Sequence, residues 1–545
     1  MMRFTGKAVV FFFALVISGC QSGMAQTGAR EPGGPWVPDS AGDTYRNPVI
    51  FADYSDPDVC RRGDDFYLVS SSFNQIPGLP ILKSKDLVNW KIIGHALLRL
   101  PPYDRYDSVR PGCGVWAPAI RFHKAKFYVY FPDPDYGIYL VTAKNPAGPW
   151  SEPLLVQGGK GLEDPCPFWD DNGNAYLVHA YAGSRAGIKS ILVLNRMSAD
   201  GTRLLDEGVI VYDGHGIDPT IEGPKLYKRE GYYYIFAPAG GVTNGWQVVL
   251  RSKHIYGPYE RRVVLRQGRT NINGPHQGAW IETARGQSWF IHFQDRGAYG
   301  RVDLLEPMMW KDAWPIIGSV VNGDSVGEPV FSYTKPDVGR EYPIEVPQTS
   351  DEFNGTAIGK QWQWQANPGA TWAFPSKSLG CLRLYARKLP DDFRNFWTVP
   401  NILSQKFPAE EFTATTRLRF SPKSDGERAG LMVLGASYAY ISLVSKSGEI
   451  HLAFTTCEGA DTGSPEDERT ITGASDSWIY LRVLVTAGAV CSFSYSFDGK
   501  QFHYIGEHFV AKPGRWIGAK VGIFCTGTIR SDDSGYADFE WFRVH

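Results

Sequence analysis

A motif that recurs five times constrains the fold of this chain more than any other feature of its sequence. Each copy has an opening residue, a turn containing Pro or Gly, a short apolar strand, a polar turn and a second strand dense in Tyr or Phe. The copies start about 48 to 60 residues apart, an interval typical of one four-stranded blade of a β-propeller. We therefore predict an all-β chain in which residues 45–335 form a five-bladed propeller. The opening residues of the five copies are Asp56, Trp116, Asp164, Glu222 and His276.

The repeat stops near residue 335, and a different pattern follows. Residues 336–350 are rich in Pro and read as a linker. Beyond them, longer strands alternate apolar and polar residues, as in residues 413–420 and 478–485. Alternation without a blade repeat predicts a two-sheet β-sandwich over residues 351–545.

Composition supports two large domains and excludes some partners. The chain has 545 residues, of which 43% are hydrophobic and 14% aromatic, and a formal net charge of −1. Without a basic field we expect no nucleic-acid partner. Aromatic side chains suit both sheets and flat ligands such as sugars. Of the eight cysteines, those other than Cys20 match no metal-binding spacing, and a disulfide in either half is left open.

The first residues have the pattern of an export signal. Arg3 and Lys7 precede an apolar run over residues 8–17, which is too short to span a bilayer as a mature helix. Small residues follow this run, as at a cleavage site. We therefore predict a signal peptide over residues 1–25.

The end of this segment is similar to a bacterial lipobox, Ile-Ser-Gly-Cys, in which Cys20 would carry the lipid. The alternative is ordinary cleavage after Ala25. Residues 26–44, rich in Gly and Pro, would form a tether. We expect an exported lipoprotein at the outer membrane or cell surface, which touches the membrane only through its anchor. Under the alternative, the protein is periplasmic or secreted.

The propeller geometry places the five opening residues around one pocket, because the innermost strand of every blade lines the central channel. Asp56 and Glu222 open blades one and four and so face each other across the ring. Asp164 opens blade three, next to Glu222, where its charge would keep the pKa of that acid high. Two opposed carboxyls, one acid and one base, are what glycoside hydrolysis needs. The Trp116 indole would stack on a sugar ring, with plain core as the alternative.

Three motifs at these blade openings resemble glycoside hydrolase family 43: SDPDV at 55–59, EDPCPFWDDNG at 163–173 and IEGPKLY at 221–227. Two stretches in the second half, DEFNG at 351–355 and WTVPNILSQKF at 397–407, look like the concanavalin-like jelly-roll sandwich of that family's β-xylosidases.

The resemblance implies an inverting mechanism, with Asp56 as general base, Glu222 as general acid, and Asp164 tuning and orienting Glu222. Inversion predicts a separation of roughly 6.5–9.5 Å between the carboxyls of the base and the acid.

Two further roles are implied by the resemblance alone. His276 resembles an axial histidine that faces a channel ion, often calcium, or a water molecule. Since one imidazole is a poor calcium ligand, we expect a largely water-coordinated ion or only water, and no required cofactor. Arg301, in GAYGRVD, resembles an arginine that reaches the sugar. The alternative for His276 is a histidine of the core, and the alternative for Arg301 is an ordinary ion pair.

Other candidates rest on residue type or position. Phe73 and Phe168 are candidates for the pocket wall, with aromatic core as the alternative. We interpret Asp58 as turn-stabilising and Asp53 as unassigned, and the pair at 170–171 as a hairpin turn.

The family role of the sandwich is to narrow the pocket with a loop aromatic, and a sugar-binding module is the alternative. Phe393 and Phe396 are candidates for that aromatic by residue type only, with sandwich core as the alternative.

Together these features predict an exo-acting inverting glycosidase. It would release terminal α-L-arabinofuranose or β-D-xylose from plant cell-wall polysaccharides or oligosaccharides. The alternatives are an endo-arabinanase on the same fold and a non-catalytic glycan-binding protein at the cell surface.

Overall fold

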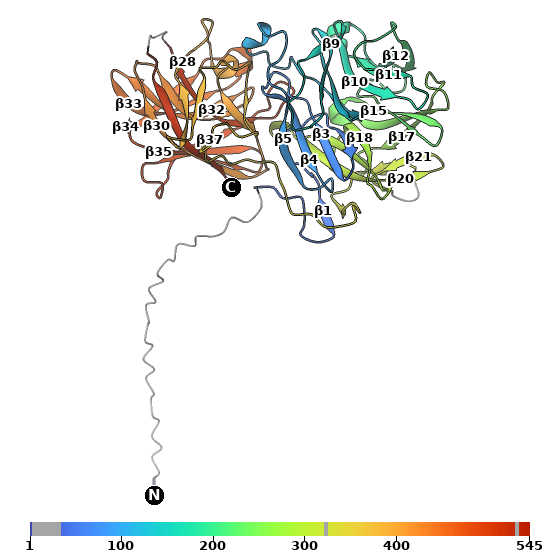
Figure 1. Cartoon of the computed structure of the whole chain (residues 1–545). Coiled ribbons are helices and arrows are strands. Elements are labelled where there is room, and N and C mark those ends of the chain that lie inside the picture. The colour runs from blue at the N-terminus through green and yellow to red at the C-terminus, as the bar shows by residue number, and fades with distance from the viewer. Residues whose placement is uncertain (3–33, 321–324, 529–532) are drawn as a thin grey trace. The chain divides into compact units, whose positions relative to one another are not determined.

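The computed structural model describes residues 1–2, 34–320, 325–528 and 533–545 (Figure 1). The expected signal peptide with Cys20, and most of the expected tether, lie outside the described residues. Among the described residues, no helix has the length and apolarity needed to cross a membrane. Gly33–His545 form one compact unit.

The first part of this unit is the predicted propeller of five blades, each an antiparallel sheet whose strands follow one another in chain order. In the fourth blade two short strands, β22 (Ser319–Val320) and β23 (Gly327–Glu328), extend the outer edge. The blades consist, in order, of β2 (Asp58–Arg62), β3 (Asp65–Val69), β4 (Gly78–Ser84) and β5 (Trp90–Leu97); β6 (Ala119–His123), β7 (Lys126–Asp133), β8 (Gly137–Ala143) and β9 (Leu154–Gly158); β10 (Leu162–Trp169), β11 (Ala175–Tyr181), β12 (Ile191–Met197) and β13 (Val209–Asp213); β14 (Lys225–Arg229), β15 (Tyr232–Ala239), β16 (Trp246–Ser252) and β17 (Glu260–Leu265); and β18 (His276–Glu282), β19 (Ser288–Asp295), β20 (Arg301–Lys311) and β21 (Trp314–Ile317).

Apolar side chains between adjacent blades hold the ring together. Separate clusters join each blade to the next, and one of them joins blade five back to blade one. The aromatic second strands supply much of this core: Tyr234 and Phe236 of β15 are fully buried. Each such side chain stabilises the fold by about 1.5–3 kcal/mol. The two ends of the propeller segment are also joined, because β1 (Thr44–Arg46) pairs with β24 (Ser332–Thr334).

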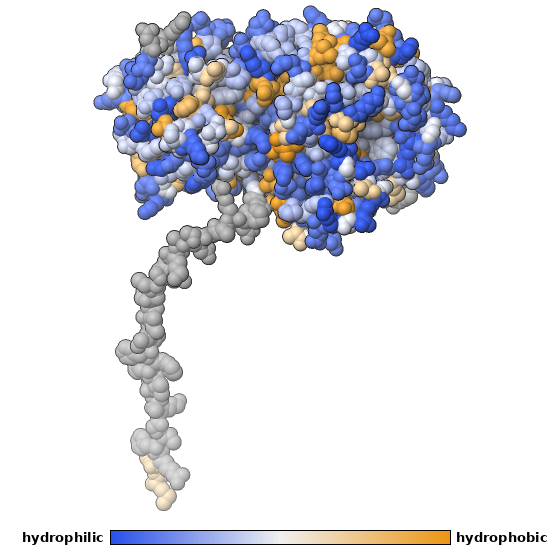
Figure 2. Space-filling view, in the orientation of Figure 1, coloured by the Kyte–Doolittle hydropathy of each residue, from blue (hydrophilic) through white to orange (hydrophobic). Residues whose placement is uncertain are grey.

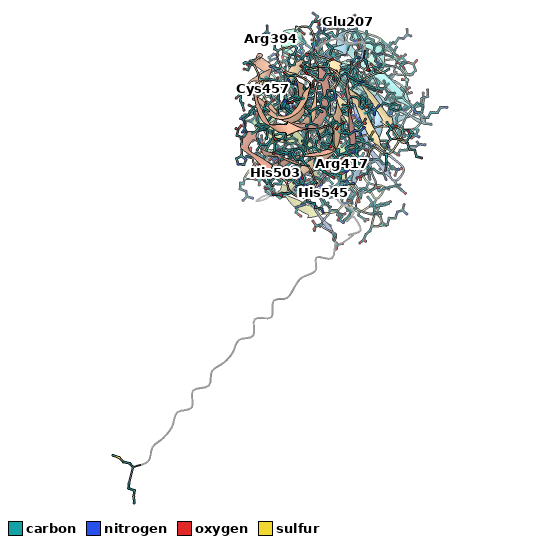
Figure 3. The ribbon with its side chains drawn as sticks, turned by 90° about the vertical axis from the view of Figure 1, so that its left-hand side faces the viewer. Glu207, Arg394, Arg417, Cys457, His503 and His545 are labelled. Atoms are coloured by element: carbon teal, nitrogen blue, oxygen red, sulfur yellow. The ribbon has the colours of Figure 1, made fainter. Side chains whose placement is uncertain are left out.

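The second part is the predicted β-sandwich, which Figure 1 shows in orange and red and Figure 3 shows with its side chains. Its strands alternate as expected: in β35 (Ile479–Thr486) every second side chain is buried. One sheet contains β25 (Gln363–Trp364), β29 (Leu403–Lys406), β38 (Lys520–Gly527), β31 (Arg428–Leu434), β32 (Tyr438–Lys446), β33 (Glu449–Cys457) and β34 (Asp467–Ala474), with β28 (Arg387–Lys388) beside β38. The other contains β26 (Ala373–Ser376), β27 (Cys381–Tyr385), β39 (Tyr536–Val544), β30 (Phe412–Ser421), β35, β36 (Val490–Ser496) and β37 (His503–Val510).

Backbone hydrogen bonds attach the sandwich to the propeller. Ile76 exchanges both backbone hydrogen bonds with Trp364, at 2.9 and 2.6 Å. Tyr299 belongs to the same hydrophobic core as the sandwich strands and accepts a hydrogen bond from Ala489 N. The face shown in Figure 2 is mostly hydrophilic with scattered apolar groups, since the large apolar side chains are taken up by these cores. The attachment brings sandwich loops to the mouth of the propeller channel.

Candidate active site

The five opening residues line one pocket of about 240 Å³ at one end of the channel. Blade one contributes Asp56 just before β2, and blade four contributes Glu222 just before β14. Asp164 lies inside β10, where the pairing between β10 and β11 is irregular. Such an irregularity changes the direction in which a side chain points. Besides the five opening residues, the residues that line the pocket are Phe73, Ala117, Glu163, Thr220, Gly241, Val242, Gln277, Arg301 and Trp516.

The backbone of this pocket is strained. Asp56, Asp164, Phe73, Thr220 and Gln277 all have positive φ angles, between 40° and 58°. This region costs a non-glycine residue roughly 1–3 kcal/mol, and such residues cluster at functional sites. The packed blades on either side stabilise these conformations, so the carboxyls are held in place before any ligand binds.

Asp56 is almost completely buried, and two groups bind its carboxylate. Ser71 Oγ donates a hydrogen bond to Oδ2, and Arg301 Nη1 lies 3.1 Å from Oδ1. Arg301 is the first residue of β20 and is itself only 8% exposed. A carboxylate that only accepts hydrogen bonds from these partners suits a group that takes up a proton.

Asp164 is bound to the turn that carries Glu222. Its Oδ2 accepts hydrogen bonds from Gly223 N at 2.7 Å and from Gln277 Nε2 at 3.1 Å. Gly223 is required here, because its φ is 58° and a Cβ would lie 2.6 Å from Gln277 Oε1. This contact fixes the position of Glu222 relative to Asp164.

Burial and the neighbouring charge of Glu222 raise the pKa of Asp164 to about 7, while Lys225 and the Gly223 amide lower it. The Lys225 side chain is 1% exposed, and its Nζ has no hydrogen-bond partner among the described residues. Asp164 therefore retains its proton toward neutral pH.

Glu222 is more accessible than the other two carboxyls, with 24% of its side chain exposed. A hydrogen bond of 2.8 Å joins its Oε1 to His276 Nε2. The partner of this imidazole is thus the proposed acid, and His276 Nδ1 is buried without a hydrogen-bond partner in the described structure.

The described side chains do not fit a directly coordinated calcium ion. Calcium takes six to eight oxygen ligands. Within the described ranges no group of three or more His, Cys, Asp or Glu side chains is arranged to hold a metal. His276 offers one nitrogen, and the Lys225 cation lies close enough to Asp164 to affect its pKa.

Aromatic side chains form the wall of the pocket. The Phe73 and Trp116 ring centroids lie 6.5 Å apart, and Trp116 and Trp516 lie 6.4 Å apart. Trp116 Nε1 donates to Gly112 O, which fixes its indole. Trp516 comes from the sandwich loop between β37 and β38 and is 41% exposed.

Trp516 is therefore the sandwich aromatic at the pocket, and the candidates Phe393 and Phe396 are wrong. Phe396 is fully buried in the sandwich core against Phe524, and Phe393 packs on the same cluster. One feature of the sequence could have identified Trp516. It stands in a turn that contains Gly and Pro, where an aromatic side chain has no core to join.

Other candidates lie elsewhere or have other partners. Phe168 lines a different cavity, which also contains Trp169 and Tyr227. The interpretation of Asp58 as turn-stabilising is wrong: it lies in β2 and links two blades, with Oδ2 2.5 Å from Arg121 Nη1. The spacing of residues along the sequence does not reveal such bonds between blades.

Glu163 is a pocket residue that the sequence reasoning missed. It is 6% exposed, and burial together with the adjacent Asp164 charge raises its pKa well above the ordinary value. Asp170 and Asp171 form a hairpin turn as expected, since Gly173 N donates to Asp170 O and Asp170 also binds Lys228.

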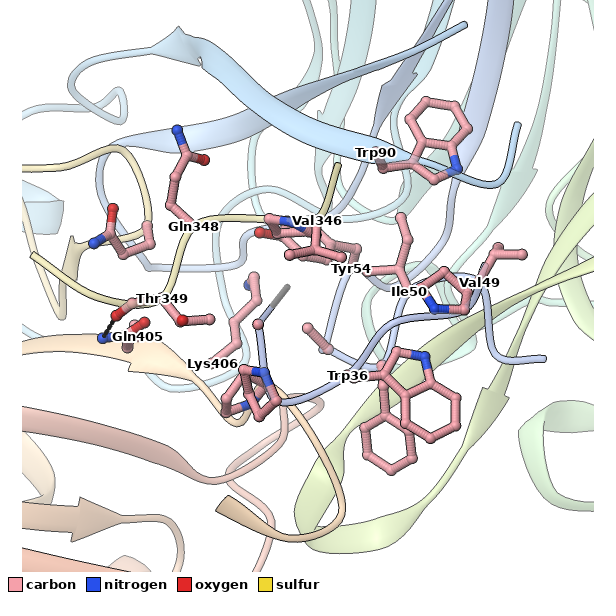
Figure 4. Close-up of a pocket in the computed structure, with 18 of the residues that line it drawn as sticks. Trp36, Val49, Ile50, Tyr54, Trp90, Val346, Gln348, Thr349, Gln405 and Lys406 are labelled. Carbon is pink, nitrogen blue, oxygen red and sulfur yellow. Dashed lines mark hydrogen bonds between the residues drawn. The ribbon is translucent and has the colours of Figure 1, made fainter. Parts of the chain in front are cut away.

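Figure 4 shows another cavity, of about 40 Å³, between the propeller, the linker and the sandwich. It is lined mainly by apolar side chains such as Trp36, Ile50 and Trp90. Its one carboxyl, Glu345, is paired with Lys91. This cavity lacks opposed carboxyls. The channel pocket has them and is therefore the candidate active site.

Known proteins are similar to both parts of the chain. Residues 45–315 match the model of the glycosyl hydrolases family 43, and residues 350–545 match that of the beta xylosidase C-terminal concanavalin A-like domain. A putative beta-xylosidase of Xylanibacter ruminicola is 39% identical over 90% of this chain and 87% of its own length. A non-reducing end alpha-L-arabinofuranosidase of Bacteroides ovatus is 30% identical over 92% of this chain and 94% of its own.

Solved structures of related proteins are similar to this chain over most of its length. A family 43 protein of a Bacteroides ovatus xyloglucan locus has a TM-score of 0.78 at 28% identity, covering 92% of this chain and 99% of its own. A xylan beta-1,4-xylosidase from Bacillus halodurans has a TM-score of 0.80 at 25% identity, and the match again covers 92% of this chain and 99% of the other. The chain belongs to glycoside hydrolase family 43.

Proposed function

We propose that this glycosidase removes terminal β-D-xylose from plant cell-wall oligosaccharides or polysaccharides by an inverting mechanism. The observation that carries this proposal is the convergence of Asp56, Asp164 and Glu222 on one small pocket with an aromatic wall. Terminal α-L-arabinofuranose is the second candidate, since relatives at 39% and 34% identity are named beta-xylosidases and one at 30% is named an arabinofuranosidase.

In the proposed reaction Glu222 protonates the glycosidic oxygen as the bond from C1 to that oxygen breaks. A water molecule attacks C1 from the opposite face and gives its proton to Asp56, so the product has the inverted configuration. The hydrogen bond with His276 engages Oε1 of Glu222, which leaves Oε2 to carry the proton toward the sugar. Asp164 stays bound to the Gly223 amide and holds this turn in place.

The pocket shape supports action at chain ends. Its volume of about 240 Å³ lies below the range of about 300–1,000 Å³ for pockets that hold drug-sized ligands. Trp516 and Trp116 are two of its lining residues, one from each domain. A pocket walled in this way holds a terminal sugar better than the middle of a chain.

The experiment compares wild-type protein with Glu222→Gln and Asp56→Asn on nitrophenyl β-D-xylopyranoside and nitrophenyl α-L-arabinofuranoside. Both variants should lose about 10²- to 10⁴-fold in kcat, the usual contribution of a positioned acid or base. Nuclear magnetic resonance of the first-formed sugar should show the inverted anomer. Retention of configuration, or full activity in Glu222→Gln, would rule out the proposed roles.

The proposal includes catalysis without a required metal ion, with water or a water-coordinated ion beside His276. It also includes export and lipid attachment at Cys20, supported by the sequence of residues 1–25 alone. Fatty-acid labelling of wild type and Cys20→Ala tests the attachment. Equal labelling of both proteins would contradict it, and loss of label in the variant would support it.

A further inference from the structure

Asp53 lies three residues before Asp56 and is 3% exposed, but it does not line the pocket. Its carboxylate accepts two backbone hydrogen bonds from distant parts of the chain. Arg301 N donates to Oδ1 at 2.9 Å, and Gly518 N donates to Oδ2 at 2.9 Å. One carboxylate thus joins blade one, blade five and the sandwich.

Both donors belong to segments that shape the pocket. The side chain of Arg301 pairs with Asp56, and Gly518 follows Trp516 by two residues. Next to this contact, Ala519 N donates to Ala298 O at 2.7 Å, so the sandwich loop runs along the blade-five turn. Asp53 is thus bonded to the two segments that carry Arg301 and Trp516, both of which line the pocket.

Two glycines allow this close approach. Gly300 has a φ of 74°, and a Cβ there would lie 2.5 Å from Asp53 Cγ. A Cβ on Gly518 would lie 2.6 Å from Gly300 N. Side chains at either position would push the loop carrying Trp516 away from blade five. The backbone of the loop is therefore seated directly on Asp53 and the turn before Arg301.

The contact needs a carboxylate. Aspartate offers two acceptor oxygens, whereas asparagine offers one oxygen and an NH₂ group, which would face one of the two N–H donors. Lys406 and Lys520 lie near enough for the Asp53 charge to raise their pKa values against the lowering effect of burial. Asn at this position would keep the volume but break one of the two bonds.

We propose that Asp53 is a positioning residue, which shapes the sugar subsite by holding Trp516 and Arg301 in a fixed relation. This inference rests on the proposed function of the same pocket. It assigns to the sandwich a direct part in sugar binding, transmitted through one side chain of the propeller.

The test is a double-mutant cycle of Asp53→Asn and Trp516→Ala in the full chain. Each single change should lower kcat/KM on the nitrophenyl glycoside by about ten- to a hundredfold, mainly through KM. Because both changes disturb the same wall, the double variant should be no worse than the poorer single variant. Effects that multiply would overturn the proposal.

Two variants separate positioning from loss of stability. Glu427→Gln is the matched control, since Glu427 is a buried carboxylate that accepts backbone N–H bonds from Lys423 and Gly535 within the sandwich. It should lower the Tm but leave KM unchanged. Gly518→Ala keeps Asp53 and should raise KM as Asp53→Asn does. If Asp53→Asn does not fold, Gly518→Ala replaces it in the cycle.

Calorimetric titration with free xylose and free arabinose gives a readout that does not need turnover. Wild type should bind one of them at least tenfold more tightly than Asp53→Asn does, while Glu427→Gln should bind like wild type. Equal binding by Asp53→Asn and wild type would overturn the inference. Absence of hydrolysis by wild type, together with this loss of binding, would overturn only the proposed function.

Discussion

Arg301 and Asp56 are 245 positions apart in the chain and form a buried ion pair, with Nη1 3.1 Å from Oδ1. The pair joins blade five to blade one, so the proposed base has its cationic partner only when the ring closes. Closure of the ring thus completes the surroundings of the Asp56 carboxylate.

Replacing Arg301 with Met should remove the partner of a buried carboxylate. Breaking one side of a buried pair costs about 3–5 kcal/mol of stability. We also expect kcat/KM to fall at least a hundredfold, because Asp56 is left without its ion-pair partner. Arg383→Met is the control: Arg383 Nε lies 2.7 Å from Asp538 Oδ1 in the sandwich. It should lower the Tm in thermal unfolding but not kcat/KM, and an equal loss of activity in both variants would contradict the assignment.

Asp164→Asn should change the pH dependence of stability. The folded-state pKa of Asp164 is about 7, above its ordinary value of 3.8. Its stabilising contribution is therefore full below about pH 4 and is lost as the pH rises through about 7. The variant should lose less Tm than wild type, by a few degrees, between pH 5 and pH 8. Identical Tm profiles in differential scanning calorimetry would show that Asp164 does not titrate in this range.

Lys225→Met should move the alkaline limb of the kcat profile to higher pH. The Lys225 cation lowers the pKa of Asp164, so its removal should raise that pKa and extend activity to higher pH. Lys228→Met is the control, because Lys228 Nζ binds Asp170 at 2.6 Å and lines a cavity other than the active-site pocket. Its pH profile should match wild type. A shift in both variants, or in neither, would contradict the assigned role of Lys225.

Opening the pocket at Trp516 should relax the preference for chain ends. Trp516→Ala should raise KM for nitrophenyl glycosides and weaken product inhibition, with kcat within a few-fold of wild type. Phe374→Ala, which removes another exposed aromatic of the sandwich, should leave both constants unchanged. Product sizes on linear xylo-oligosaccharides measure the preference. A fall in kcat without a change in KM would place Trp516 in the chemical step instead.

Chelation should leave the activity intact, because the proposed mechanism needs no metal ion. We expect protein dialysed against EDTA to keep full kcat/KM and the same Tm. The check is the rate before and after chelation and after addition of calcium. Loss of activity that calcium alone restores would contradict this expectation.

Much of the catalytic domain could be predicted because a propeller converts spacing along the chain into position around a ring. Equivalent residues of the repeat lie at equivalent heights, so the openings at Asp56, Asp164 and Glu222 had to meet. The same reasoning brought Trp116 and His276 to the pocket, although it did not predict the direct bond from His276 to Glu222.

Residues outside the repeat could not be predicted in this way. Glu163 lies beside a repeat position, but strand alternation alone would point it away from its neighbour Asp164. The irregular pairing of β10 brings both to the pocket. Asp58 looked like part of a local turn, because its partner Arg121 belongs to the next blade.

The fold class, the five blades and the three carboxyls follow from the order of residues along the chain, since periodic patterns of apolar residues dictate local strands and their order. The place of Trp516 in the pocket wall, and its link through Asp53 to Arg301, arise only when the two domains pack together. These contacts join segments hundreds of residues apart through single backbone hydrogen bonds. They depend on how two domains pack, and no periodicity in the chain records that packing.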